Sequence, residues 1–130
     1  MQKSIVQAFP NAPIRFAIVW VDILPSDGEK TALKAARNLS QDPRIRQFRD
    51  PHQRVAHAVP TSLHWTGRAY DIYLFYPKHS EWKGEMPPPA AYVHQMGSHS
   101  QDGHFFTGDD LVRELREVAA ATLREAAAKP

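Results

Sequence analysis

The strongest constraint on the fold is the run of residues 16–21, which is apolar throughout and rich in β-branched and aromatic side chains. A strand with one face in water alternates apolar and polar residues, whereas this run is typical of a strand covered on both faces in a parallel sheet. A second run, apolar and aromatic except for Asp71, covers residues 70–76. Both runs are therefore expected to be buried strands of an α/β domain.

Helical spacing of apolar residues marks two further segments. Residues 29–39 place alanines and leucines at intervals suited to a helix that packs one face on a sheet. Residues 109–127 repeat this pattern after the N-cap chemistry of residues 107–110. The other expected elements are a short strand over 45–48, a short helix opened by Asp50-Pro51, a loop over 60–68, and a strand over 90–96 that forms an antiparallel hairpin with 70–76.

Length and composition indicate one globular domain over residues 1–130. The chain is 42% hydrophobic and 23% charged, which is ordinary for a globular protein of this size. Its formal charge of +2 comes from basic and acidic residues interleaved along the chain, so a nucleic-acid partner is not expected. The longest apolar run is too short to cross a bilayer, and the first residues do not resemble a signal peptide. We expect a soluble, cytoplasmic protein without a membrane partner.

Three segments carry a resemblance to a known family: residues 16–24, residues 47–51, and residues 70–77 followed by 90–96. The resulting order of elements resembles the thioredoxin-like superfamily, closest to its TlpA and peroxiredoxin-like branch. Residues 19–25 and 71–77 are also similar to stretches of uncharacterised bacterial thioredoxin-like proteins. The resemblance implies a three-layer α/β sandwich, with a mixed sheet of about four strands, a C-terminal antiparallel hairpin and a final helix.

The residues that carry redox chemistry in that superfamily are absent. Its active members hold a Cys-x-x-Cys motif at a helix N-terminus, which depresses the pKa of the attacking thiol, and this chain has no cysteine. Gly67-Arg68-Ala69 stands where the family places a cis-proline before the hairpin. No catalytic residue is therefore assigned, and the chain cannot perform thiol-disulfide chemistry with its own residues. A truncated or partner-completed thiol oxidoreductase relative is one alternative, and a homodimer paired through an open strand edge is expected on similar grounds.

Three histidines in one short stretch suggest a possible metal site. His94, His99 and His104 lie close in sequence to Met96 and Asp102, and imidazole and carboxylate groups bind divalent transition metals. Their spacing matches no sharp zinc signature, and a polar loop of glycine, serine and histidine is the competing interpretation. A metal-binding accessory protein is therefore an alternative function, and no other cofactor is expected.

Two aspartates and one serine occupy positions where other chemistry is conceivable. Asp22 and Asp50 follow predicted parallel strands, where open α/β sheets place ligand crevices, but a structural role as caps and turn formers is the favoured interpretation. Ser62 near His64 lacks the strand-to-helix elbow of a hydrolase serine, so no catalytic triad is expected.

Two tryptophans fall outside the predicted strands. Trp65 and Trp82 lie in polar or proline-rich connections, where a large ring covers a sheet edge or forms part of a binding surface. With residues 87–89 they form a candidate partner-binding patch. The sequence thus favours a non-enzymatic binding or interaction module that recognises a protein partner.

Overall fold

The computed structural model describes residues 5–39 and 42–128, which fall into two compact units. One unit is Pro13–Tyr70, and the other comprises residues 71–128 together with 5–12. We name them the β1–β2 unit and the β3–β4 unit after their strands. The single domain expected over residues 1–130 stays a prediction.

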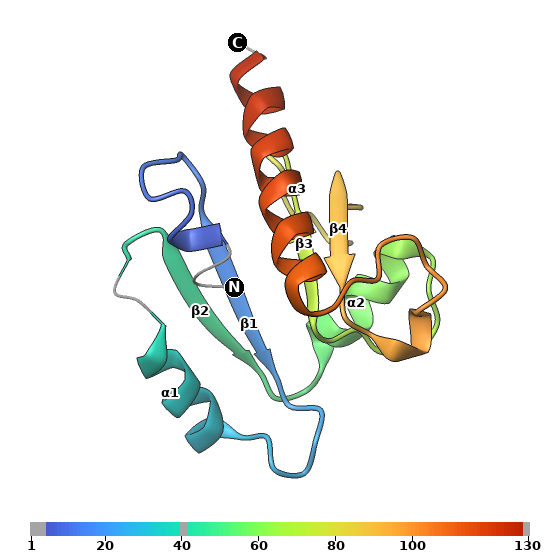
Figure 1. The fold of residues 1–130 in the computed structure, drawn as a ribbon. Helices are drawn as coiled ribbons and strands as arrows, with labels where there is room; N and C mark the ends of the chain where they lie inside the picture. Colours follow the sequence, from blue (N-terminus) through green and yellow to red (C-terminus); the bar gives the residue numbers. More distant parts are fainter. Residues whose placement is uncertain (1–4, 40–41, 129–130) are drawn as a thin grey trace. The chain divides into compact units, whose positions relative to one another are not determined.

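The β1–β2 unit is built on two parallel strands joined by a helix. Strand β1 (Phe16–Val21) leads through helix α1 (Glu29–Asn38) to strand β2 (Ile45–Asp50). The strands pair in parallel from Phe16↔Ile45 to Val21↔Asp50, and both arrows run in the same direction in Figure 1. This confirms the predicted strand, crossover helix and second strand, with β2 two residues longer than expected.

Side-chain hydrogen bonds tie the sheet together and hold α1 against it. The indole Nε1–H of Trp20 on β1 donates to Oε1 of Gln47 on β2 at 2.9 Å. The amide of Gln47 in turn donates to the carbonyl of Ala36 in α1 at 3.4 Å. The polar side chain of Gln47 is thus tolerated on this covered face of the sheet, because both the oxygen and the nitrogen of its amide are hydrogen bonded.

Helix α2 (Arg54–Leu63) begins directly after β2, and the carboxylate of Asp50 caps it. Asp50 accepts backbone N–H groups from Arg54 at 2.8 Å, Val55 at 2.8 Å and Ala56 at 3.4 Å. The first N–H groups of a helix have no partner within it, so one buried carboxylate satisfies three of them. This is the structural role expected for Asp50.

The loop predicted over residues 60–68 is wrong at its start, because α2 continues through Pro60 to Leu63. A proline within a helix has no N–H to offer the carbonyl four residues earlier, which normally breaks the helix. Here that carbonyl, of Ala56, accepts the N–H of Ala69 at 2.8 Å instead. The returning chain replaces the missing bond, so α2 tolerates a buried proline.

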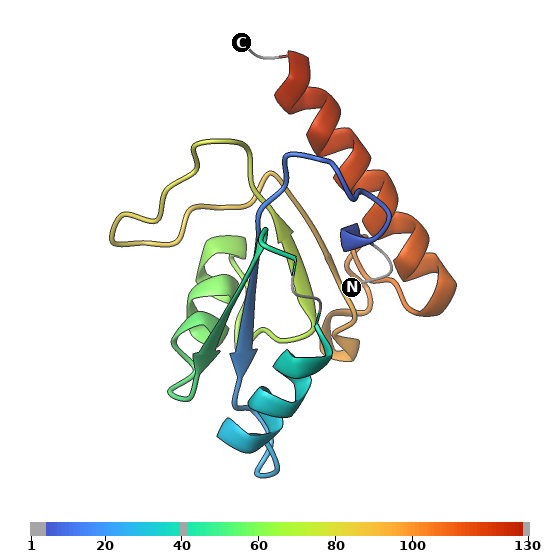
Figure 2. The ribbon, with the colours of Figure 1, turned by 90° about the vertical axis from the view of Figure 1, so that its left-hand side faces the viewer.

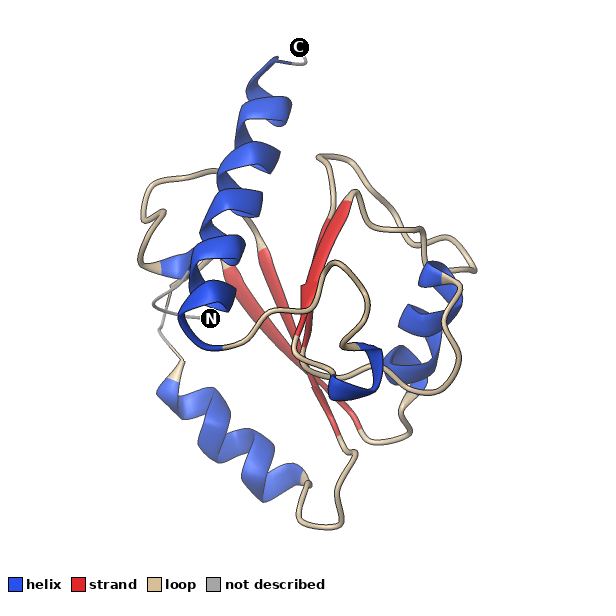
Figure 3. Cartoon of the chain, turned by 45° about the vertical axis from the view of Figure 1, so that its right-hand side comes forward, coloured by secondary structure: helices blue, strands red, loops and turns tan. Residues whose placement is uncertain are grey.

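The β3–β4 unit contains an antiparallel pair and the last helix. Strand β3 (Ile72–Phe75) pairs with strand β4 (Ala91–His94), from Ile72↔His94 to Phe75↔Ala91, which confirms the predicted hairpin. Helix α3 (Gly108–Ala128) packs against both strands (Figure 3). Its buried residues Leu111, Leu115 and Ala119 follow the apolar stripe expected from the sequence.

Both strands of this pair are shorter than predicted. Asp71 adopts a left-handed conformation with φ of 48°, which interrupts the extended backbone just before β3. Pro77, two residues beyond the end of β3, cannot donate to a ladder. The ladder is therefore limited to four residue pairs, 72–75 with 91–94.

The four strands form two two-stranded sheets, where the sequence predicts one mixed sheet of about four strands. An apolar run shows that a strand is covered, but it does not show which strand or helix covers it. The α/β class and the final helix are confirmed. Among residues 5–39 and 42–128, no helix is long and apolar enough to cross a membrane.

Candidate functional site

The histidine-rich segment folds back onto β4 through the backbone of His94. The N–H of His94 donates to the carbonyl of His104 at 3.0 Å, and the N–H of Phe106 donates to the carbonyl of His94 at 3.0 Å. Between them lies a short 3₁₀ helix, η2 (Gly97–His99), visible before α3 in Figure 3. The chain therefore returns to the last residue of β4 at residues 104–106, which closes the preceding segment into a loop.

The imidazole of His94 is completely buried, with 0% of its surface exposed. Its Nδ1 accepts the backbone N–H of Met96 at 3.1 Å, so the proton of the neutral ring is on Nε2. Nε2 lies 3.8 Å from Oδ1 of Asp102. Burial lowers the pKa of His94, the charge of Asp102 opposes that effect, and the charges of His99 and His104 reinforce it. The structure thus holds His94 as a neutral ring.

Asp102 connects this segment to the side chain of Tyr92 on β4. Its Oδ2 accepts the Tyr92 hydroxyl at 3.0 Å, and its Oδ1 accepts the backbone N–H of His104 at 2.7 Å. Burial raises the pKa of Tyr92 to about 12, and the hydrogen bond with Asp102 and its negative charge contribute to the shift. A phenol in this state donates a hydrogen bond and does not serve as a base near neutral pH.

The three imidazoles of the metal hypothesis lie near one another but have different neighbours. The His104 ring stacks on Tyr92 with centroids 3.9 Å apart, and its Nδ1 lies 3.0 Å from the Tyr92 carbonyl oxygen. His99 Nδ1 lies 3.1 Å from the hydroxyl of Ser98, and its ring meets His94 edge-on at 6.4 Å. Within the part of the chain that the structure describes, no three His, Asp or Glu side chains are arranged to hold a metal ion.

The two tryptophans of the predicted partner-binding patch belong to different units. Trp65 follows α2 in the β1–β2 unit, is half-buried, and donates its backbone N–H to Pro60 at 2.8 Å. Trp82 lies in the β3–β4 unit on the connection between β3 and β4, and 51% of its surface is exposed. Of the two residues, only Trp82 is exposed over about half of its surface.

The connection that carries Trp82 is internally braced. The Trp82 Nε1–H donates to the carbonyl of Gly84 at 2.9 Å, and Lys83 and Glu85 form an antiparallel bridge. Gly84 adopts φ of 75°, a left-handed conformation that favours glycine at this turn. Near its base, the Tyr76 hydroxyl donates to the carbonyl of Pro87 at 3.0 Å. Residues 77–90, which we name the Trp82 loop, project beyond the strand ends in Figure 2.

A hollow of about 160 Å³ lies between the carboxyl end of β1 and the start of α1. Of the carboxylates in its lining, Asp22 pairs with Arg49 at 2.6 Å, and Asp27 accepts the N–H groups of Ile23 at 2.9 Å and Leu24 at 2.7 Å. Both carboxylates are used within the chain, so Asp22 has the structural role that the sequence also allows. The hollow has no carboxylate left to orient a ligand.

No protein-family model matches the chain, and no curated protein or solved structure matches it. No relative therefore supplies a role for any of these residues. The sequence singled out His94, Asp102 and Trp82, but it did not identify Tyr92 as the structural partner of Asp102 and His104. The signal for Tyr92 was its position two residues before His94 on one strand, which places both side chains on the same face.

Proposed function

We propose that the chain is a non-enzymatic protein-binding module and that the Trp82 loop is its contact element. The single observation that carries this proposal is the half-exposed indole of Trp82, held in place by a hydrogen bond to Gly84. Tryptophan is among the residues that contribute most to binding energy at protein interfaces. An exposed tryptophan on a braced loop is well suited to anchor a partner.

The bracing of the loop favours binding because it reduces the entropy lost when a partner docks. A flexible loop must be ordered on association, and each immobilised side chain opposes binding by about 0.5–1.5 kcal/mol. In the Trp82 loop the bridge between Lys83 and Glu85 and the bond from Tyr76 to Pro87 already restrict the backbone. The backbone of the loop is thus already ordered at these points before the partner docks.

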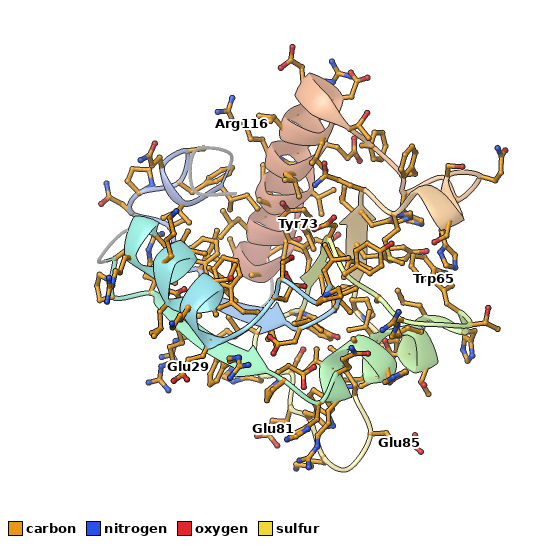
Figure 4. All side chains as sticks on the ribbon, turned by 90° about the horizontal axis from the view of Figure 1, so that it is seen from below. Glu29, Trp65, Tyr73, Glu81, Glu85 and Arg116 are labelled. Carbon is orange, nitrogen blue, oxygen red and sulfur yellow. The ribbon has the colours of Figure 1, made fainter. Side chains whose placement is uncertain are left out.

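Charged groups around the indole indicate the chemistry of the partner. Glu81 and Glu85 are exposed on the same loop, and Figure 4 shows both on its outer part. Lys83 pairs with Glu81 at 3.0 Å, so the residues around the indole, 81–85, carry a net charge of −1, which Lys78 balances over the whole Trp82 loop. The matching surface is an apolar pocket for the indole with basic residues at its rim.

The thioredoxin-like resemblance is part of this proposal. The order of parallel unit, hairpin and C-terminal helix supports it, while the absence of cysteine excludes thiol-disulfide exchange by the chain's own residues. A scaffold of this class that lacks the nucleophilic cysteine can still bind partners through its exposed surface. We therefore assign the function to an exposed surface. In this proposal the histidine-rich segment supports the structure of β4.

The test compares three immobilised proteins: wild type, Trp82→Ala and Tyr70→Ala. Tyr70 is a matched control because it is also an exposed aromatic residue, at 41%, and lies in the other unit. Proteins from the source cells are captured and quantified, and the captured partner is then purified. We expect wild type and Tyr70→Ala to bind the purified partner equally and Trp82→Ala to bind it at least about tenfold more weakly.

A second readout follows the indole directly. In a variant with Trp20→Phe and Trp65→Phe, Trp82 is the only tryptophan, and its fluorescence should shift to shorter wavelength when the partner covers it. Equal binding by wild type and Trp82→Ala, or an unchanged emission spectrum in the complex, would show that the loop is not the contact element.

A further inference from the structure

The outer edge of β2 presents backbone groups that do not take part in the β1–β2 ladder. The N–H of Phe16 donates to the carbonyl of Arg44 at 2.9 Å, and the N–H of Asp22 donates to that of Asp50 at 3.4 Å. A parallel ladder uses alternate residues of each strand. The even-numbered residues of β2 therefore bond to β1, while Gln47 and Arg49 direct their N–H and C=O groups to the opposite edge.

The side chains along this edge are basic and aromatic. Arg46 and Phe48 are two residues apart, so they lie on the same face of the sheet, and Phe48 is 51% exposed. Arg49 pairs with Asp22 at 2.6 Å and Arg44 with Asp42 at 2.7 Å. Arg46 makes no ion pair with any residue that the structure describes. One exposed cation next to an exposed phenyl ring remains available on this face.

We propose that β2 binds an extended segment of a partner protein as a third strand of the β1–β2 sheet. Main-chain bonds to Gln47 and Arg49 would supply affinity, and the side chains of the incoming strand would supply specificity. The segment carries an acidic residue opposite Arg46 and an apolar residue two positions away, opposite Phe48. Opposite charges and apolar pairs directly across a ladder are the favourable combinations.

Charge complementarity favours a foreign segment over a second copy of the same edge. A second β2 strand would bring another Arg46 but no available carboxylate, because the only acidic residue of the strand is Asp50. Both oxygens of Asp50 accept N–H groups at the start of α2. The acidic residue opposite Arg46 therefore comes from a segment other than β2.

The probe is a capped, fluorescein-labelled peptide with the sequence Thr-Glu-Thr-Phe-Thr-Glu-Thr-Val, compared with the same peptide carrying lysine for glutamate. Binding is measured by fluorescence anisotropy with the full chain. We expect saturable binding of the glutamate peptide, at least about tenfold weaker binding by Arg46→Glu, and stronger binding of the lysine peptide by that variant. Arg15→Glu is the matched control, because it makes the same charge change at an exposed arginine outside β2.

Two N-methylated peptides test for strand addition as opposed to general charge attraction. Methyl groups on one set of alternate backbone nitrogens block the bonds to β2, whereas the other set points away from it. We expect one methylated peptide to lose binding and the other to retain it. Absence of binding, equal losses for both methylated peptides, or equal losses for Arg46→Glu and Arg15→Glu would overturn the proposal.

The proposal is independent of the Trp82 loop. Trp82→Ala should bind the glutamate peptide as wild type does, so failure of one site is distinguishable from failure of the other. Sedimentation of the chain as a dimer that excludes the peptide would also overturn the proposal, because the edge would then belong to a second copy.

Discussion

Residues 77–90 and residues 95–107 are two polar loops of the same unit, and the structure holds them in opposite ways. In the first, the Trp82 loop, bonds within the loop brace a turn whose indole is exposed. In the second, bonds run to β4, and Asp102 and the buried His94 fix the segment to the strand. A loop braced by its own residues can present a surface, whereas a loop fixed to the core mainly stabilises it.

If the second loop stabilises the core, substitution of His94 should lower the free energy of unfolding more than any change within these two loops. His94→Ala removes a fully buried ring and leaves the Met96 N–H without its acceptor. We expect a loss of about 2–4 kcal/mol in the free energy of unfolding, measured by urea denaturation. His52→Ala, at an exposed histidine, should change the unfolding free energy by less than about 0.5 kcal/mol. Equal losses in both variants would show that the segment is not held by His94.

Asp102 should give the next largest effect. Asp102→Ala removes the acceptor for the Tyr92 hydroxyl and the His104 N–H, which should lower the free energy of unfolding by about 1–3 kcal/mol. In a Tyr92→Phe background the same substitution should cost less, because one of the two donors is already absent. Strict additivity of the two substitutions would contradict the bond between Tyr92 and Asp102.

A pH titration probes the same segment without changing its covalent structure. The pKa of His94 is lowered from its ordinary value of 6.5, chiefly by burial, so just below pH 6.5 the unfolded chain binds a proton that the folded chain does not. The contribution of neutral His94 to the free energy of unfolding is therefore complete above about pH 6.5. It decreases as the pH falls toward the pKa of His94 in the folded protein. Protonation would also place a proton on Nδ1, where Met96 now donates.

The control for this titration is His94→Gln, which keeps an acceptor for Met96 but does not titrate. Thermal unfolding measured between pH 7.5 and 5 should show a smaller decrease in stability for His94→Gln than for wild type. Parallel curves for the two proteins would mean that His94 has an ordinary pKa.

Much of the secondary structure could be predicted because local patterns determine it. The apolar runs identified β1 and β3, and helical spacing identified α1 and α3. Pro60 misled the prediction because the bond that replaces its missing N–H comes from Ala69, nine residues away. The arrangement of the strands as two pairs was also missed, because apolar character records burial and not the identity of the neighbour.

The candidate sites were predictable only in part. The sequence identified the histidines as a group. It did not identify the groups that they contact, because those contacts form only when residues 104–106 fold back onto β4. It identified Trp82 by its setting among polar and proline residues. The exposure of Phe48 was not expected, because an aromatic residue in a strand is usually covered. The available signal for an open edge was the presence of Arg46 and Arg49 in the same short strand as Phe48.

The smallest expected effect on stability is that of Trp82→Ala, and it completes the comparison of the two loops. Because half of the indole is already in water and its one hydrogen bond is exposed, we expect the free energy of unfolding to change by less than about 0.5 kcal/mol. Urea denaturation of Trp82→Ala and His94→Ala under the same conditions measures the two losses. A loss as large as that of His94→Ala would show that Trp82 stabilises the fold. That result would contradict its assignment as a residue that mainly binds a partner.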